Sequence, residues 1–282
     1  MTSVYMQEGR FLVGKTEATA DLKESILRAV NLIGGFDKAI QDGDHVTIKP
    51  NWNTADPYPA SSDPAFIKAL GELLLEHGAS GIRIIDSSML RKNTREVAEE
   101  TGVISVAQEL DAELIFLDEH EWVKVDFPRG KYLKSGSIGK PLLDIEKLVL
   151  APCLKTHFLA DYTGSMKLFM GWIRPRDRIM IHARKLREKV VDLASYFKPH
   201  LIVMDARKCF TEGGPASGTC ASPGVILASG DMVAIDVEGV RTIKCCQGKN
   251  DLSGDVWEVL QIRHAAALGI GAKSDEDILV IE

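Results

Sequence analysis

Apolar residues recur along the chain with two alternating periods. Leu22, Ile26 and Val30 are spaced as on one face of a helix, and the apolar run at 45–49 that follows is short and strand-like. The alternation continues to the end of the chain. We expect strands at 45–49, 81–86, 113–117, 147–151, 200–205, 224–229 and 278–281, and helices at 22–33, 64–78, 93–110, 184–197 and 256–268, with a further helix opening at Asp231. Gly102 is a candidate break within the helix at 93–110.

Strands that are largely apolar and alternate with helices are typical of the α/β class, in which a mainly parallel sheet is covered by helices on both faces. Residues 122–133 differ, because apolar and polar side chains alternate there around a turn at 128–130. That pattern predicts a small antiparallel hairpin. Residues 158–181 carry few regular signals and dense charge, so we expect a lid-like insertion or subdomain within a single α/β domain that spans 1–282.

The composition is that of an ordinary globular protein, with 45% hydrophobic and 26% charged residues, which excludes a largely disordered chain. The net charge of −6 argues against nucleic acid and against an anionic membrane surface as main partners. No stretch approaches the ~18 apolar residues of a membrane span, and Met1 to Arg10 has no apolar secretory core. We therefore expect a cytoplasmic protein.

Polar residues follow several of the expected strands at the end where the chain leaves the sheet. In open α/β sheets, ligands bind beyond the carboxyl ends of the strands, so we expect these residues to meet at one edge. They are Lys49, Asn51 and Asn53 after the first strand, Asp86 after the second, Lys155 and His157 after 147–151, Asp205 with the loop residues Glu212, Gly213 and Gly214, and Asp231 after 224–229.

Basic, amide and backbone groups near this edge are suited to holding an anion. The candidate substrate-binding residues are Lys49, Asn51, Asn53, Lys167, Arg174, Glu212, Gly213 and Gly214. Each has an ordinary alternative, such as a surface lysine, an asparagine in a turn or, for the basic run from Arg174 to Lys189, a solvated helix face. Within that run, Arg174, Arg176 or Arg178 could capture the phosphate or carboxylate. The glycines indicate a close approach of the backbone to another group, but they match neither a GxGxxG nor a P-loop pattern.

Lys155, His157 and Asp231 are the candidate catalytic residues. Residues two apart in an extended segment point to the same side, so we expect Lys155 and His157 to face one cleft. A lysine beside a histidine disfavours the imidazolium, which leaves a neutral base near pH 7. The alternatives are a solvent-exposed Lys155 whose replacement leaves stability nearly unchanged, a His157 that stabilises a turn, and an Asp231 that caps the helix after it.

Several of these segments together resemble the family defined by domain of unknown function 362. The matching motifs are Ile48-Lys49-Pro50-Asn51, Ser62-Asp63-Pro64, Cys153-Leu154-Lys155-Thr156-His157, Ser165-Met166-Lys167-Leu168-Phe169-Met170-Gly171, Gly213-Gly214-Pro215 and Gly230-Asp231-Met232-Val233-Ala234-Ile235-Asp236. They extend from about Val46 to Asp236, most of the chain. The family has no general assigned activity, so the resemblance implies the fold and the place of the site.

The chain departs from the family pattern at three points. Members often carry a ferredoxin-like iron–sulfur segment, and the cysteine spacing for one is absent after Asp236. The lysine-asparagine pair of the family is Lys167-Leu168 here, and its glycine-asparagine-glycine-proline is Glu212-Gly213-Gly214-Pro215. We also expect a distant likeness to the fold of the nickel-pincer lactate racemases, which no residue motif carries.

Two functions follow from these candidates. The first is an enzyme acting on a small carboxylate or phosphate substrate, in which Lys49, Lys155 and Arg174 hold the anion and His157 moves a proton with Asp231 or Glu212. The alternative is a non-catalytic protein that binds a divalent metal or an iron–sulfur cluster. The metal would lie on His157, Glu212, Asp231 and Asp236, and the cluster on Cys209, Cys220, Cys245 and Cys246. Because the five cysteines contain no CxxC pair, we expect neither a cluster nor a disulfide. The sequence carries no signal of an oligomeric state.

Overall fold

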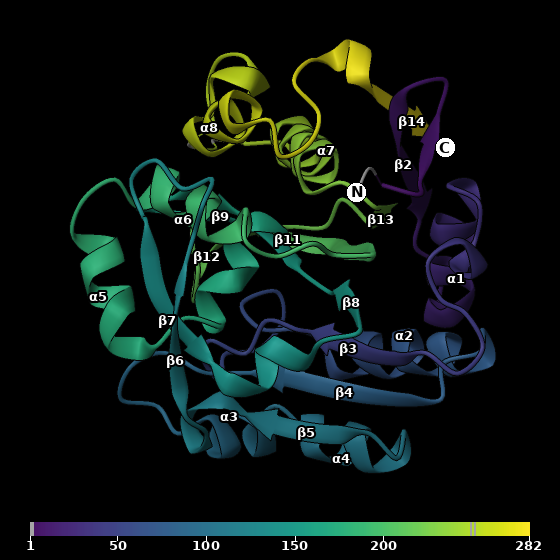
Figure 1. Ribbon diagram of the computed structural model, residues 1–282. Helices are drawn as coiled ribbons and strands as arrows, with labels where there is room; N and C mark the ends of the chain where they lie inside the picture. The colour runs from purple at the N-terminus through teal and green to yellow at the C-terminus, as the bar shows by residue number, and fades with distance from the viewer. Residues whose placement is uncertain (1–2, 249, 251) are drawn as a thin grey trace.

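The structure is a computed structural model that describes residues 3–248, 250 and 252–282. The strands of this part of the chain form one twelve-stranded sheet and a separate two-stranded hairpin (Figure 1). The main path through the sheet runs in the order β1 (Met6–Gln7), β2 (Arg10–Glu17), β13 (Val225–Ser229), β11 (Leu201–Gly213), β8 (Lys147–Leu150), β3 (His45–Lys49), β4 (Gly81–Asp86) and β5 (Glu113–Phe116).

The sheet is parallel over most of this path and mixed toward one side. β5, β4, β3, β8 and β11 all run parallel to one another. β13 is antiparallel to both β11 and β2, and the last strand, β14 (Ile278–Ile281), pairs in parallel with β2. The fold is therefore α/β with a mainly parallel central sheet, as the alternation of periods predicts.

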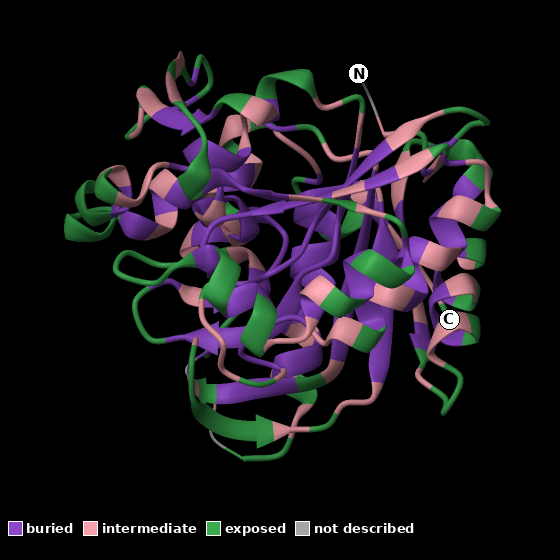
Figure 2. Cartoon of the chain, turned by 90° about the horizontal axis from the view of Figure 1, so that it is seen from below, coloured by how far each residue is buried: buried purple, intermediate pink, exposed green. Residues whose placement is uncertain are grey.

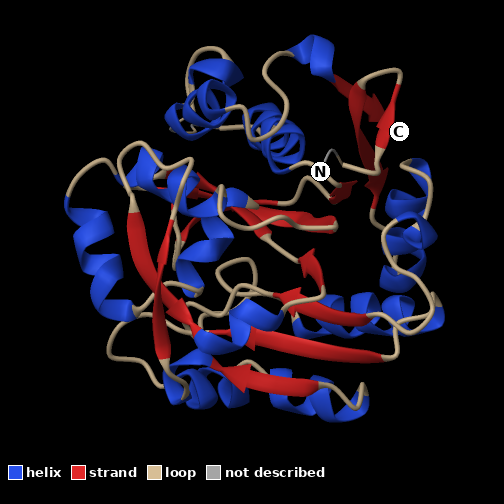
Figure 3. Ribbon diagram, in the orientation of Figure 1, coloured by secondary structure: helices blue, strands red, loops and turns tan. Residues whose placement is uncertain are grey.

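Helices cover both faces of the sheet (Figures 1 and 3). One face carries α1 (Leu22–Leu32), α2 (Pro64–Glu76), α3 (Thr94–Glu100) and α4 (Val103–Glu109), and the other carries α6 (Leu186–Ala194), α7 (Met232–Cys245) and α8 (Leu260–Leu268). Successive strand residues face opposite sides of the sheet. Val149 of β8 therefore packs in the hydrophobic core beneath α1–α4, whereas Leu148 and Leu150 pack in the core beneath α6–α8. The strands are accordingly the most deeply buried part of the chain (Figure 2). None of the helices in the described ranges is long and apolar enough to cross a membrane.

Beyond Pro152 the chain stays in the sheet. Residues Cys153–His157 form β9, which pairs in parallel with β11 and antiparallel with β10 (Asp161–Thr163). The strand predicted at 147–151 does end before Pro152, but the expectation that the chain then leaves the sheet is wrong, because β11 is 13 residues long and extends past β8. Its free length offers an edge to β9 on one side and to β12 (Gly218–Ala221) on the other.

The expected hairpin is formed by β6 (Trp122–Asp126) and β7 (Ser135–Gly139), which pair antiparallel. The expected insertion at 158–181 contains β10, the 3-10 helix η4 (Met166–Gly171) and most of α5 (Pro175–Ala183). Met166, Phe169 and Trp172 are fully buried in the core on the α6–α8 face. The middle of this segment is therefore part of the core, and exposed apolar residues lie only near its two ends.

Candidate functional site

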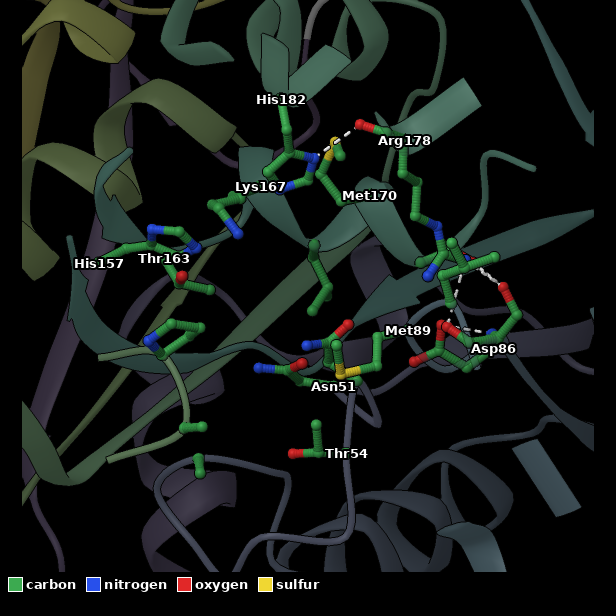
Figure 4. Close-up of a pocket in the computed structure, with 18 of the residues that line it drawn as sticks. Asn51, Thr54, Asp86, Met89, His157, Thr163, Lys167, Met170, Arg178 and His182 are labelled. Atoms are coloured by element: carbon green, nitrogen blue, oxygen red, sulfur yellow. Dashed lines mark hydrogen bonds between the residues drawn. The ribbon is translucent and has the colours of Figure 1, made fainter. Parts of the chain in front are cut away.

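A cavity of about 420 Å³ opens at the carboxyl ends of β3, β4 and β9 (Figure 4). Its walls come from the loops after these strands, from η4 and α5, and from the loop between β11 and β12. Small-molecule sites commonly enclose roughly 300–1,000 Å³. Six residues expected from the sequence line this cavity, namely Lys49, Asn51, Asn53, Lys155, His157 and Lys167. The expectation that residues after different strands meet at one edge of the sheet is confirmed for these six and for Asp86, which also lines the cavity, whereas Asp205 does not line it.

Lys49 and Asp86 form a buried ion pair at the base of the cavity. Lys49 Nζ lies 2.8 Å from Asp86 Oδ1, and both side chains are almost fully buried. Asp86 also accepts hydrogen bonds from the backbone N–H groups of Trp52 at 3.1 Å and Ser87 at 2.7 Å. Burial lowers the pKa of Lys49, and the Asp86 carboxylate opposes that shift. The charge of Lys49 is thus balanced within the protein.

Gly171 packs directly against this ion pair. A Cβ at position 171 would overlap Asp86 Oδ1 and crowd Lys49 Nζ. Glycine therefore allows the end of η4 to close over the two charges, which keeps water away from them.

Lys155 and Lys167 are different, because no carboxylate of the described chain forms an ion pair with either of them. Lys155 is 1% exposed, and its Nζ donates a 2.7 Å hydrogen bond to the carbonyl oxygen of Pro59. Burial lowers its pKa. Burial and the positive charges of Lys155 and Arg178 lower the pKa of Lys167 to about 7. Both ammonium groups therefore remain available to an anion.

Arg178 supplies the arginine of the site. Its guanidinium is buried and donates to the carbonyl oxygens of Ile173 at 2.9 Å, Ser88 at 2.6 Å and Gly171 at 2.9 Å. Burial lowers its pKa to about 10. Arg174, which the sequence favoured, pairs with Asp177 at 2.8 Å and does not line the cavity. The arginine at the cavity is therefore one helical turn further along the chain.

The cavity carries an excess of positive charge. Four cationic side chains line it, namely Lys49, Lys155, Lys167 and Arg178. Asp86 is the one carboxylate among the described residues that line it. This concentration is local, since the whole chain has a net charge of −6.

The cavity wall also contains an unused hydroxyl group. Thr163 is 5% exposed, and its Oγ1 has no hydrogen-bond partner within the described chain. A buried polar group without a partner costs about 1–3 kcal/mol. An oxygen atom of a ligand would satisfy this hydroxyl.

Two histidines of the cavity are in opposite tautomeric forms, as their partners require. His157 Nδ1 accepts hydrogen bonds from the backbone N–H groups of Leu159 at 3.1 Å and Ala160 at 3.2 Å, so the neutral ring carries its proton on Nε2. His182 Nδ1 lies 2.7 Å from the carbonyl oxygen of Arg178, which can only accept, so its Nε2 holds a lone pair. The site thus offers one imidazole N–H donor and one basic nitrogen.

Both rings are neutral at pH 7. Burial, followed by the charges of Lys167, the neighbouring His182 and Lys155, lowers the pKa of His157 to about 2. Burial also lowers the pKa of His182, with Lys167 and Arg178 contributing. Lys167 projects between the two rings (Figure 4). The lysine effect on His157 has the direction that the sequence predicts, although burial is the larger cause.

Asp236 holds the segment that carries Thr163 and Lys167. Its carboxylate accepts hydrogen bonds from the backbone N–H groups of Ser165 at 2.6 Å and Met166 at 3.2 Å, and from the Tyr162 hydroxyl at 3.1 Å. Burial raises its pKa to about 6. Asp236 therefore positions the cavity wall from α7, outside the cavity itself.

Comparison with known proteins agrees with the motifs found in the sequence. The model of the family named Domain of unknown function (DUF362) matches residues 46–241, well over half of the chain. This protein belongs to the DUF362 family. The matched range includes every residue that lines the cavity.

Individual relatives of this DUF362 protein are distant. A thylakoid-associated protein of Synechocystis sp. is 24% identical over 229 residues, which are 76% of this chain and 68% of that protein. Among solved structures, the lactate racemase apoprotein from Thermoanaerobacterium thermosaccharolyticum has a TM-score of 0.42 at 10% identity, and a protein from Thermotoga maritima has 0.45 at 12% identity. Each covers 79% of this chain, which spans only 55% and 56% of their respective lengths.

Asp231 does not lie at the cavity. Because β13 is antiparallel to β11, the end of β13 reaches the opposite edge of the sheet. There Asp231 caps α7 by accepting from the backbone N–H of Ala234 at 2.8 Å, and it also accepts from Ala272 at 3.2 Å. The expectation that it joins Lys49 and Lys155 is wrong, since strand direction is not encoded in the apolar pattern. The helix-cap alternative describes its contacts.

The loop after β11 reaches the cavity through other residues than expected. Glu212 is exposed and does not line it. Gly213 and Gly214 do not line it either, although Pro215 and Ala216 do. Gly214 has a φ of +69°, and a Cβ there would overlap the carbonyl oxygen of Thr156 in β9. The close approach that these glycines indicated is to neighbouring backbone.

The residues proposed as metal or cluster ligands do not form a ligand set, although the thiols of Cys209 and Cys246 lie within hydrogen-bonding reach of each other. No group of three or more His, Cys, Asp or Glu side chains in the described ranges is arranged to hold a metal ion. Asp231 and Asp236 bind backbone groups elsewhere, as described above. All five cysteines are free thiols.

Two residues at the cavity, Thr163 and His182, were not among the sequence-based site residues, and Arg178 was only one of three arginines that the sequence offered. Pro175 at the first turn of α5 is a helix-start signal, and reading it would have placed Arg178 and His182 on one face, four residues apart. Thr163 has no comparable signal, because its exposure to the cavity depends on the pairing of β10 with β9.

Proposed function

We propose that this DUF362 protein is an enzyme that binds a small carboxylate or phosphate substrate in the cavity. The enzyme would remove a proton from a carbon atom of this substrate and return one to it. The observation that carries the proposal is a pair of lysines without an ion-pair partner in the described chain. Lys155 is buried and Lys167 is half-buried. Removing a charge from water costs several kcal/mol unless it is compensated. An anionic ligand would supply that compensation.

The surrounding groups support an arrangement for the anion. The ammonium groups of Lys155 and Lys167 would contact its oxygens, with the Thr163 hydroxyl and the His157 Nε2–H as further donors. The guanidinium of Arg178 is already occupied by carbonyl oxygens, so it contributes positive potential. Each of these groups is held by the fold before a ligand arrives.

The basic nitrogen of His182 supports the proton-transfer step. With the carboxylate held among the cations, His182 Nε2 would take a proton from the adjacent carbon. The negative charge left on the substrate would be stabilised by the same cations, and the histidine would then return a proton to the carbon. General base catalysis of this kind commonly contributes roughly 10²–10⁴-fold.

The binding part of the proposal is tested by calorimetric titration with acetate, phosphate, sulfate and a set of 2-hydroxy acids. We expect Lys155→Met to weaken binding at least tenfold, which is about 1.4 kcal/mol. Lys198→Met is the matched control, because Lys198 is exposed and lies outside the cavity. Equal affinities in wild type and Lys155→Met, for every anion that binds, would remove Lys155 from the site.

The proton transfer is tested by nuclear magnetic resonance in D₂O with the carboxylates that bind. We expect deuterium to enter the carbon next to the carboxylate, and His182→Gln to slow this exchange by about 10²-fold or more while retaining binding. Binding without any exchange would favour a non-catalytic binding protein.

A further inference from the structure

In this cavity the charged side chains are buried at the inner end and the apolar side chains are exposed at the outer end, the reverse of the usual arrangement in a protein. Its charged groups are at the inner end, where Lys49 and Lys155 are each 1% exposed and Arg178 is 7% exposed. Its outer end is apolar, with Phe158 at 66% and Ile179 at 54% exposure. Charged side chains normally lie outside and apolar ones inside.

The apolar residues at the mouth are concentrated there. Nine large hydrophobic residues are exposed in the part of the chain that the structure describes, and five of them line the cavity. These five are Met89, Leu90, Phe158, Leu159 and Ile179. A sixth, Met180, follows Ile179 on α5. Single exposed apolar residues are common, whereas a contiguous group usually marks a contact site.

The apolar mouth comes from three separate segments of the chain. Met89 and Leu90 follow β4, Phe158 and Leu159 form the turn between β9 and β10, and Ile179 projects from α5. Pro215 and Ala216 of the β11–β12 loop add a fourth side. The apolar residues therefore lie on several sides of the entrance. Their position relative to the cations is fixed by β9, which carries Lys155 and leads directly into Phe158.

We infer that the ligand of this cavity is an amphiphilic anion, with a carboxylate or phosphate head at Lys155 and Lys167 and an alkyl or aromatic part against the apolar mouth. The inference rests on the proposed function, since it assumes that the inner end holds an anion, and it adds the chemical class of the remainder of the ligand. A purely polar anion such as phosphate would leave the apolar mouth in water. An apolar tail would bury it, and binding would strengthen with each methylene group removed from water.

The experiment is calorimetric titration with acetate, butanoate, hexanoate and octanoate at pH 7. We expect the dissociation constant to fall by about tenfold for each two added methylene groups. Octanamide, which has the same tail and no charge, is expected to bind at least tenfold more weakly than octanoate.

Variants at the mouth separate the tail contact from the head contact. We expect Phe158→Ser and Ile179→Ser to flatten the dependence on chain length. Ile179→Ser should leave acetate binding unchanged, because Ile179 is exposed and is not one of the proposed anion donors, whereas Phe158 also stacks on the His157 ring. Leu143→Ser is the matched control, since Leu143 is 49% exposed and lies outside the cavity. It should leave the whole series unchanged.

The two levels of the proposal fail in different ways. If acetate and octanoate bind equally, and Lys155→Met weakens both, the anion site stands and the amphiphilic ligand is refuted. If octanamide binds as tightly as octanoate, or if no member of the series binds, the anion site itself is refuted. If Phe158→Ser and Ile179→Ser leave the chain-length dependence intact, the mouth does not hold the tail and the inference is refuted.

Sedimentation with phosphatidylglycerol vesicles distinguishes the source of such a ligand. Binding to the vesicles that is lost in Phe158→Ser would indicate a lipid whose tail stays partly in a bilayer. Chain-length dependence in solution without vesicle binding would indicate a free amphiphile.

Discussion

Lys49 at the end of β3 and Lys155 in the middle of β9 show how one partner changes the role of a side chain. Lys49 and Lys155 are equally buried, but only Lys49 lies against a carboxylate. The sequence places both after apolar strands and does not distinguish them. Lys49 has an ion pair with Asp86, whereas Lys155 donates to carbonyl oxygens and, within the described chain, has only the more distant Asp205 carboxylate, which opposes the lowering of its pKa by burial.

The same substitution should therefore have opposite effects on stability at these two positions. Lys49→Met leaves the buried Asp86 carboxylate without its cation, and we expect it to lower the free energy of unfolding by about 3–5 kcal/mol. Lys155→Met removes an uncompensated buried charge, and we expect the free energy of unfolding to stay the same or rise by about 1 kcal/mol.

Urea unfolding of both variants measures this contrast. A loss of more than 2 kcal/mol in Lys155→Met would mean that the protein itself compensates the Lys155 charge. The alternative of a solvent-exposed Lys155 is wrong, because the side chain is buried. A small effect of Lys155→Met on the free energy of unfolding is still expected, because the substitution removes a buried charge.

Lys167 should make anion binding dependent on pH. Its folded-state pKa of about 7 is below the usual value for lysine, so the ammonium is present below pH 7 and is lost as the pH rises through 7. The charge of sulfate is constant over this range. We expect its dissociation constant to be at least about tenfold larger at pH 8.5 than at pH 6.5.

Calorimetric titration of Lys167→Met provides the control for this pH dependence. We expect its affinity for sulfate to be lower at pH 6.5 and to change little with pH. A wild-type affinity that is flat from pH 6.5 to 8.5, or a slope that persists in Lys167→Met, would contradict the assignment to Lys167.

At the scale of elements, η4 is the piece that closes the inner end of the cavity. Gly171 at its end allows Asp86 and Lys49 to lie directly beneath the backbone. We expect Gly171→Ala to lower the free energy of unfolding by about 1–3 kcal/mol, as overpacked positions do, and to weaken anion binding because η4 also carries Lys167.

Thermal unfolding and sulfate titration of Gly171→Ala test this role. Wild-type stability together with wild-type affinity would show that η4 can move away from the ion pair at no cost, and that the packing at Gly171 does not position the site.

The sequence predicted the bounds of those helices and strands that are determined by their own residues. The predicted strands at 45–49, 81–86 and 278–281 have the bounds of β3, β4 and β14, and the predicted break at Gly102 separates α3 from α4. These features follow from local periodicity, turn residues and caps. The parallel centre of the sheet followed from them.

Features that depend on distant partners could not be predicted in the same way. The direction of β13 is set by its pairing with β11 and β2, and it moved Asp231 to the other edge. β9 exists because β11 extends beyond β8. The placement of Lys155 and His157 at one cavity was therefore predicted correctly, because their common side follows from local geometry, whereas the placement of Asp231, which depends on topology, was not.

At the scale of the whole molecule, an acidic chain encloses a cationic cavity with an apolar mouth. The two hydrophobic cores on either side of the sheet supply the stability against which uncompensated charges are held. Natural proteins commonly accept such a cost at functional sites. The central claim is that an anion occupies the inner end of the cavity, at Lys155 and Lys167.

The most direct test is anomalous diffraction from crystals grown without sulfate or phosphate and then soaked in selenate. Selenium in the anion marks its position, and crystals of the Lys155→Met, Lys167→Met double variant, soaked in the same way, are the control. We expect an anomalous peak within hydrogen-bonding distance of both ammonium groups and near the Thr163 hydroxyl, and none in the double variant. Peaks confined to the protein surface, with the cavity empty, would contradict the account.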